Sequence, residues 1–267
     1  MSREQHRPED ADYRDTEQQQ HQKYRTFYAR EDLGHAKLPA SDYFAKLTNL
    51  RLSLVRGFYH SGCVLDLCCG SGDYLIPLAP SVDQMVGVDF SPELIAAARR
   101  RVASAGQMNI CLCVGNARRI PVRSDSISLL FSFSSLYYVP MVNHVVTECA
   151  RVLVAGGVAI LEFGVLHSLN TIVCRAYPEL ATPCHIPLIK IHRMLSAAGF
   201  AVEDDIALQT LPLWGNRPVW LRPFLHRYWK RLLEHEVGDR MLDQRLSGLG
   251  LLRNFAFRHI LICTKIC

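Results

Sequence analysis

From residue 63 onward, the chain alternates short apolar runs with longer amphipathic stretches. The apolar runs fall at 63–67, 84–88, 110–114, 127–133 and 158–163. Runs of about five apolar residues are typical of strands that are buried on both faces of a parallel sheet. The stretches between them, including 92–105 and 141–153, carry apolar residues at helical spacing. This alternation predicts a doubly wound α/β sheet.

The two ends of the chain follow other patterns. Residues 1–20 are polar and lack periodicity, so we expect them to be disordered. Residues 21–59 show helical spacing interrupted by a loop, which predicts an N-terminal helical cap or lid. Strands are predicted at 200–208 and 256–264. The segment between them, 209–255, has a helical pattern and is long for a connection. We therefore expect one sheet domain over 60–267, with 209–255 inserted as a substrate cap.

Composition and charge narrow the class of protein. The chain has 267 residues, of which 49% are hydrophobic and 21% charged, as in an ordinary globular protein. The net charge of +5 is too small to indicate nucleic acid as a partner. No apolar run approaches the roughly 18 residues of a membrane span, and the N-terminus lacks a signal-peptide core. We therefore expect a cytoplasmic protein with reduced thiols. Neither the ten cysteines nor the histidines show the spacing of metal ligands, so no metal is predicted.

The strongest chemical signal is the segment VLDLCCGSG at 64–72, which leaves an apolar run and enters a helix. Gly70 and Gly72 allow a sharp turn and a close approach of the backbone to a ligand. A dinucleotide fingerprint would need a third glycine where this chain has Leu75. Asp66 stands before the glycines, where a carboxylate is poorly suited to a pyrophosphate. A ligand with an ammonium group explains Asp66 better.

The next two apolar runs also end in residues suited to a nucleoside. Asp89 ends the second run, where a carboxylate can accept hydrogen bonds from ribose hydroxyls. Phe90 beside it can cover a flat base. Ser91 is predicted to cap the following helix, which fixes the position of Asp89. Asn116 follows the third run, and its amide offers both a donor and an acceptor to an adenine edge.

Together these segments resemble class I S-adenosylmethionine-dependent methyltransferases, in the broad group that modifies small molecules and lipids. The resemblance covers about residues 60–165. It is carried by the 64–72 loop, VGVDFSP at 86–92, VGNA at 114–117, FSFSS at 131–135 and AGGV at 155–158. It implies a seven-stranded, mostly parallel, Rossmann-like sheet with helices on both faces and an antiparallel last strand. It also implies S-adenosyl-L-methionine as the cofactor.

The resemblance assigns roles within the cofactor site. The glycine loop would cradle the methionine part, Asp66 would lie near the methionine amine, and Asp89 would bind the ribose hydroxyls. Adenine and the sulfonium would be contacted further along the chain, and a leading helix would close over the cofactor. The predicted cofactor site comprises Tyr24, Tyr28, Asp66, Cys68, Gly70, Gly72, Asp89, Phe90, Asn116, Ala117, Ser132 and Phe133. Cys68 departs from the family, which has glycine there. Asn116 replaces the usual aspartate and Ala155 a common proline.

A general base is needed only for an acceptor that starts protonated. The candidates at the ends of the fourth and fifth strands are Tyr137, Tyr138, His144, Glu162 and His167. We select His167 and Tyr137 as catalytic residues, although a solvent-facing loop histidine is an alternative reading of His167. The expected acceptor is a hydroxyl or amine of a small molecule, a glycan or a lipid-linked compound. The other hypothesis is a cofactor-binding homologue without turnover, which would act as a regulatory or structural partner.

Residues 214–231 hold all three tryptophans and five Lys or Arg residues, and they hold no acid. Tryptophan and arginine together suit a lipid headgroup boundary, so we expect a possible peripheral membrane contact there. They also suit an anionic or glycan acceptor, and a cap helix packed on the sheet is a third reading. No nucleic-acid partner is expected, and the sequence does not determine the oligomeric state.

Overall fold

The computed structural model describes residues 42–177, 184–215 and 217–266. Tyr24, Tyr28, the predicted disordered arm and the first helix of the predicted cap lie outside these residues. The sheet elements and the helices between them run in chain order as α2 (Asp42–Phe58), β1 (Cys63–Leu67), α3 (Leu75–Leu78), η1 (Ala79–Ser81), β2 (Gln84–Asp89), α4 (Pro92–Ser104), β3 (Ile110–Val114), β4 (Ile127–Ser132), η2 (Leu136–Tyr138), α5 (Val142–Val152) and β5 (Leu153–Gly164). The remaining elements are α6 (Leu169–Arg175), α7 (Leu188–Ala197), β6 (Phe200–Leu208), η3 (Val219–Leu225), α8 (Arg227–Leu233), β7 (Glu236–Val237), β8 (Arg240–Met241), α9 (Leu242–Ser247), α10 (Gly250–Arg253) and β9 (Arg258–Lys265).

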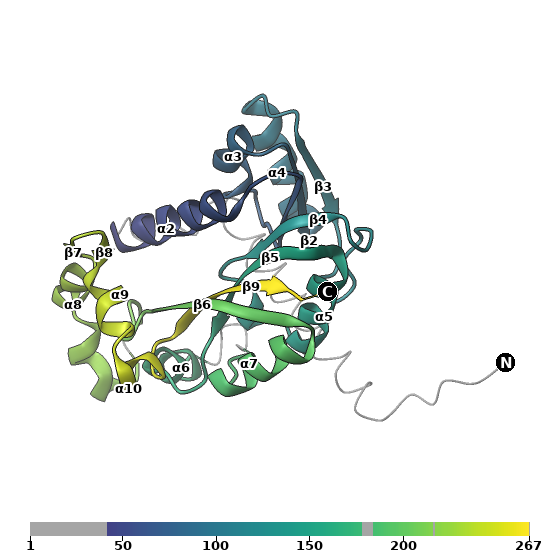
Figure 1. Cartoon of the computed structure of the whole chain (residues 1–267). Coiled ribbons are helices and arrows are strands. Elements are labelled where there is room, and N and C mark those ends of the chain that lie inside the picture. Colours follow the sequence, from purple (N-terminus) through teal and green to yellow (C-terminus); the bar gives the residue numbers. More distant parts are fainter. Residues whose placement is uncertain (1–41, 178–183, 216, 267) are drawn as a thin grey trace.

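The main sheet has seven strands in the order β3-β2-β1-β4-β5-β9-β6 (Figure 1). Strands β1 to β5 pair in parallel, and β9 runs antiparallel to both β5 and β6. The predicted doubly wound sheet with an antiparallel last strand is confirmed. The order reverses between β1 and β4, and ligands of open α/β sheets bind beside such a switch point, at the carboxyl ends of the strands.

Helices cover both faces of this sheet (Figure 1). One buried cluster joins the sheet to α5 and α7, and the other joins it to α2, α3 and α4. The start of α4 forms as predicted, because the Ser91 hydroxyl accepts a hydrogen bond from Leu94 N at 3.2 Å and Pro92 occupies the first turn. The two clusters hold the strand ends in fixed positions, which the site described below requires.

Two predicted features differ in the structure. The run 110–114 forms β3, but Cys111 is exposed, because β3 is an edge strand and an apolar run alone does not show which strand lies at an edge. The insertion 209–255 contains helices, as expected, but also the two-stranded hairpin β7–β8. That hairpin is too short to leave a periodic pattern in the sequence.

The insertion is tied to α2 by buried hydrogen bonds. The Tyr43 hydroxyl donates to Asp243 Oδ2 at 2.5 Å, and both residues are fully buried. Tyr43 N donates to Glu234 Oε2 at 3.1 Å. Asp243 also accepts from the backbone N–H groups of Gln209 and Thr210, at the end of β6. The insertion is therefore anchored near the carboxyl edge of the sheet, beside α2 (Figure 1).

Candidate functional site: a cofactor loop and a buried arginine pair

In the glycine loop after β1, every second residue from Cys68 to Gly72 has a left-handed backbone angle. The φ angles are 63° at Cys68, 53° at Gly70 and 85° at Gly72. Gly70 N donates to Asp89 Oδ2 at 2.9 Å, and Cys69 N donates to Val88 O at 3.0 Å, so the loop is fixed to the end of β2. Cys68 adopts an angle that favours glycine, which explains why the family has glycine at this position. Cys68 therefore holds this angle at a cost in strain.

Asp66 carries a buried carboxyl oxygen that no group in the described part of the chain satisfies. The residue is 2% exposed, and Oδ2 makes no hydrogen bond there. Burial raises the pKa of the Asp66 carboxyl well above its usual value, and the charges of Asp89 and Asp73 add to this effect. A buried unpaired acceptor is costly unless a ligand completes it. The ammonium group of S-adenosylmethionine fits this requirement in charge and in hydrogen bonding.

Asp89 has a larger structural role than the sequence indicated. Its two oxygens accept from Gly70 N and Ser91 N, each at 2.9 Å. Burial raises the pKa of the Asp89 carboxyl, while these backbone N–H groups act in the opposite direction. Each carboxylate oxygen can accept a second hydrogen bond, so contact with ribose hydroxyls stays compatible with this geometry.

The remaining predicted cofactor residues lie after β2, β3 and β4, at the same edge of the sheet. Phe90 is partly buried. Asn116 Oδ1 accepts from Arg118 N at 2.9 Å, and Ala117 is buried in the core. Ser132 is fully buried and donates to Leu67 O at 2.8 Å, so its hydroxyl ties β4 to β1.

An aromatic group follows β4. The Phe133 ring stacks on Phe131 with centroids 5.3 Å apart, and the Tyr74 ring lies 5.2 Å from Phe133. The Arg51 guanidinium lies over the Phe133 ring, 5.4 Å from its centroid. Aromatic rings and one guanidinium therefore line the part of the site that the resemblance assigns to the cofactor sulfonium.

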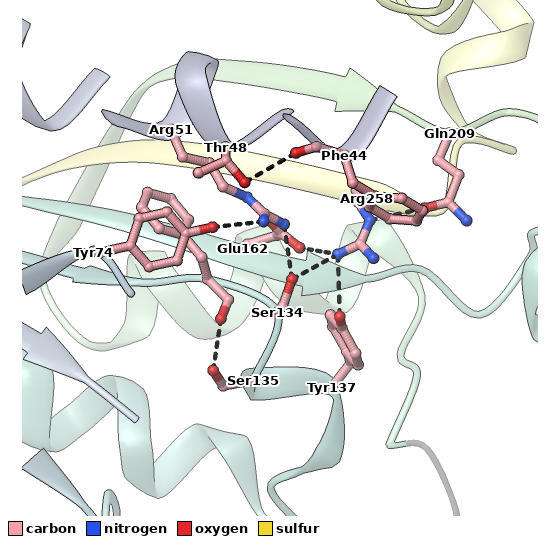
Figure 2. A network of polar contacts seen from close by, with 11 residues as sticks. Phe44, Thr48, Arg51, Tyr74, Ser134, Ser135, Tyr137, Glu162, Gln209 and Arg258 are labelled. Carbon is pink, nitrogen blue, oxygen red and sulfur yellow. Dashed lines mark hydrogen bonds and ion pairs between the residues drawn. The ribbon is translucent and has the colours of Figure 1, made fainter. Parts of the chain in front are cut away.

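The sequence reading missed a buried cluster that joins α2, β5 and β9 (Figure 2). Glu162 on β5 is fully buried between two arginines. Arg51 Nε donates to Glu162 Oε2 at 2.8 Å, and Arg258 Nη1 donates to Glu162 Oε1. Burial acts to raise the pKa of the Glu162 carboxyl, but the two arginines outweigh it and lower that pKa below its usual value. Glu162 is therefore an ionised, fully engaged partner and is unsuited to act as a base.

The two predicted catalytic residues lie in different surroundings. His167 is exposed in the loop after β5. Tyr137 is buried, and its hydroxyl accepts from Arg258 Nη1 at 3.1 Å (Figure 2). The other candidates also differ, because Tyr138 is partly buried and His144 is exposed. The structure thus brings Tyr137 to the carboxyl edge near Glu162 and leaves His167 in solvent.

A buried histidine that sequence reasoning did not single out lies close to Tyr137. His185 Nδ1 lies 2.8 Å from Thr171 Oγ1, and its Nε2 has no partner in the described part of the chain. Burial lowers the pKa of His185 to about 4, and the positive charges of Arg175 and Arg258 contribute. The signal in the sequence was a histidine two residues before Pro187 in a predicted loop, which is too weak to identify it. In the described residues no group of histidine, cysteine and acidic side chains could hold a metal ion.

Comparison with known proteins agrees with this geometry. Residues 64–157 match the family model of a methyltransferase domain. A demethylmenaquinone methyltransferase of Shouchella clausii is 29% identical over 146 residues, which cover 53% of this chain and 60% of that protein. A Pyrococcus horikoshii protein of known structure has a TM-score of 0.59 at 18% identity, covering 91% of this chain and 97% of that one.

A second structural neighbour has the cofactor bound. Phosphoethanolamine N-methyltransferase 2 of Haemonchus contortus, solved with S-adenosyl-L-methionine, has a TM-score of 0.58 at 16% identity, covering 82% of this chain and 53% of that one. Sheet order, glycine loop and the methyltransferase-domain match over residues 64–157 together support a class I S-adenosylmethionine-dependent methyltransferase domain in this chain, which spans 60% or less of the length of the demethylmenaquinone methyltransferases that it matches. Its cofactor is S-adenosyl-L-methionine.

Proposed function

We propose that this chain transfers the methyl group of S-adenosyl-L-methionine to a hydroxyl or amine of a small-molecule, glycan or lipid-linked acceptor. The observation that carries the cofactor half of this proposal is the buried, unpaired Oδ2 of Asp66 beside the glycine loop. The relatives named demethylmenaquinone methyltransferase support a small-molecule acceptor.

The bound cofactor supplies a methyl group on a positively charged sulfur. In this proposal Asp66 accepts a hydrogen bond from the cofactor ammonium, and Asp89 accepts from its ribose while fixing the loop at Gly70. Phe133 and Tyr74 exclude water from the sulfonium side. Much of the acceleration can come from holding the acceptor in line with the methyl group. Tyr137 is the better placed of the two proposed catalytic residues, because it is held at the strand ends by Arg258.

Calorimetric titration with S-adenosylmethionine tests cofactor binding. We expect wild-type protein to bind and Asp66→Asn to bind about 10- to 100-fold more weakly, since a hydrogen bond to a charged group contributes roughly 1.5–3 kcal/mol. Glu203→Gln is the matched control, because Glu203 is an exposed acid on β6 and is not among the charges that act on Asp66. Equal affinity of all three proteins would remove Asp66 from the cofactor site.

The second candidate function is cofactor binding without turnover. It is favoured by the exposed position of His167 and by the engagement of Glu162 with two arginines, because neither of these two candidates is then suited to act as a base at the strand ends. Incubation with methyl-labelled cofactor and acceptor pools separates the two functions. Labelled product in any pool supports transfer. Tight cofactor binding with no labelled product in any pool supports the second function.

We also propose that the cap contacts a membrane surface. Trp220 on η3 is 61% exposed and Trp229 on α8 is 40% exposed, and the basic residues Arg222 and Arg231 beside them are exposed too. Aromatic and basic side chains together anchor peripheral segments to anionic lipids. Within the described ranges no helix has the length and apolarity needed to cross a bilayer. The contact that we propose is peripheral, and the location that we propose is cytoplasmic.

Flotation with vesicles tests the membrane contact. Wild-type protein should float with vesicles that contain phosphatidylserine at low salt and should be released at high salt, because exposed charges are screened. Replacing Trp220 and Trp229 by serine should reduce flotation. Failure of wild-type protein to float at low salt would refute the contact.

A further inference from the structure

Arg258 lies where β9 meets the carboxyl ends of its two neighbours. It pairs with Gly164, the last residue of β5, and with Leu208, the last residue of β6. Because β9 is antiparallel, its first residue sits at the edge where the parallel strands end. This is the edge at which open α/β sheets bind ligands. Arg258 also contacts Ser134 Oγ through Nη1 at 3.2 Å, and Ser134 directly follows Phe133, on the proposed sulfonium side.

The hydrogen bonds of the Arg258 guanidinium leave one nitrogen without an acceptor. Nε donates to Gln209 Oε1 at 2.8 Å, and Nη1 donates to Glu162, Ser134 and Tyr137 (Figure 2). Within the described residues, Nη2 makes no hydrogen bond. The Arg258 side chain is only 10% exposed. A guanidinium has five N–H donors, and the two on Nη2 can be reached by a ligand, because Nη2 is not among the fully buried side-chain atoms that lack a partner.

The charge around this nitrogen is also incompletely balanced. Among the described residues, Arg258 forms an ion pair only with Glu162, and Glu162 is shared with Arg51. Asp243 is the other buried acid nearby, and its contacts are the neutral donors Tyr43, Gln209, Thr210 and Ser247. The positive charge of Arg258 also contributes to lowering the pKa of His185.

The walls beside Arg258 are aromatic. Its Cζ lies 5.6 Å from the Tyr137 ring centroid and 5.2 Å from that of Phe257. His185 packs against the same two rings, at 6.1 and 5.0 Å between centroids. Gly164 permits this convergence, because an added Cβ would meet Phe257, His185 and Tyr137 at 2.8–2.9 Å. The rings hold the plane of the guanidinium, whose planar fork matches a carboxylate or a phosphate.

We infer that Arg258 binds an anionic group, a carboxylate or a phosphate, of the methyl acceptor through Nη2. This inference rests on the proposed methyl transfer. The anion accepts hydrogen bonds from the unpaired N–H groups of the guanidinium. It also balances the positive charge that is left over because Arg51 and Arg258 share the single carboxylate of Glu162. The methionine carboxylate of the cofactor is a second source of the same chemistry, so the experiment must separate the two.

The test uses the full chain saturated with S-adenosylhomocysteine, which fills the cofactor site without a methyl group. Benzoate and phenyl phosphate are titrated as anionic probes, and benzamide is the neutral probe of similar shape. We expect both anions to bind and benzamide to bind at least about tenfold more weakly. Arg258→Gln should weaken the anions about tenfold or more and leave cofactor affinity within about twofold. Arg193→Gln, an exposed arginine on α7, is the matched control and should change neither.

Glu162 keeps Arg51 as a partner in Arg258→Gln, which favours folding. If that variant nevertheless fails to fold, Arg258→Lys carries the test, because a lysine keeps the charge and loses the planar fork. It should weaken both anions and spare the cofactor.

Each contrary outcome has a distinct meaning. Equal anion affinity in wild type and the Arg258 variants overturns the inference, as does absence of anion binding to the saturated wild-type protein. Loss of cofactor affinity in the Arg258 variants assigns Arg258 to the cofactor carboxylate and also overturns it. Failure of wild-type protein to bind S-adenosylmethionine or S-adenosylhomocysteine refutes the proposed function itself.

Discussion

Replacing Asp66 by asparagine should stabilise the protein without ligand and weaken cofactor binding. The Asp66 carboxyl is 2% exposed with Oδ2 unpaired, and burial and two neighbouring acids raise its pKa. An amide of the same shape is less costly to bury than a carboxyl that must either ionise or hold a proton. We expect a gain in the free energy of unfolding of about 1–3 kcal/mol at neutral pH, which is about 2–4 °C in Tm for each kcal/mol.

The pH dependence of this gain has a definite sign. Because the pKa of Asp66 is higher in the folded than in the unfolded protein, the folded state binds more protons above pH of about 3.9. Wild-type protein therefore loses stability as the pH rises from about 4 through the folded-state pKa, and Asp66→Asn does not. The difference between the two proteins should be smallest below pH of about 4 and should grow toward neutral pH.

Thermal denaturation with and without S-adenosylmethionine measures both effects. The variant should melt at a higher temperature than wild type without the cofactor and should gain less from its addition. Glu203→Gln, which removes an exposed acid on β6 that is not among the charges acting on Asp66, should change both quantities little. A lower Tm for ligand-free Asp66→Asn at neutral pH, or an undiminished cofactor shift, would refute the reasoning.

Three further predictions follow from other buried groups. Cys68→Gly should raise the free energy of unfolding, measured by chemical denaturation, by about 1 kcal/mol, because glycine relieves the strain of a φ of 63°. Cys69→Gly is the control and should lower the free energy of unfolding, since Cys69 is buried and lies outside the left-handed region. Equal losses in both variants would contradict the strain at Cys68. Burial holds His185 neutral with a pKa of about 4. The free energy of unfolding of the wild-type protein should therefore fall by about 3 kcal/mol relative to that of His185→Asn as the pH falls from 6.5 to about 4. Parallel curves of stability against pH for the two proteins would argue against this. Tyr43→Phe removes the hydroxyl that donates to Asp243, so it should cost about 1–3 kcal/mol and increase hydrogen exchange in α9; unchanged exchange there would show that the hydrogen bond does not anchor the insertion.

The residues of the proposed cofactor half could be singled out from the sequence because the segments that carry them are local. The glycines, Asp66 and Asp89 belong to two strand–loop–helix units, and each unit fixes its own residues through backbone geometry and capping. Several strand boundaries could be predicted for the same reason, because β1, β3 and β6 have the ranges that the apolar runs predicted. The start of β5 was missed by five residues, since the Leu153 end is held by pairing with Ile127 and not by an apolar run.

The acceptor half could not be read in this way. Arg51, Glu162 and Arg258 are up to 207 positions apart in the chain and meet only because α2 covers the face on which β5 and β9 pair. Single arginines on a helix or a strand carry no periodic or spacing signal, and the basic excess of residues 190–267 does not tell a buried arginine from an exposed one. His185 is a similar case, because only packing against Tyr137 and Phe257 makes it neutral.

The sequence by itself determined the alternating sheet and its glycine loop, because hydrophobic period and turn chemistry are short-range properties of the chain. The class of cofactor followed from the resemblance of these segments to a known family. The tertiary structure decided which strand lies at the edge, where the insertion is anchored, and which charges share the carboxyl edge of the sheet. Those properties depend on contacts between distant segments, and the balance of charge around Arg258 exists only once these segments are folded together.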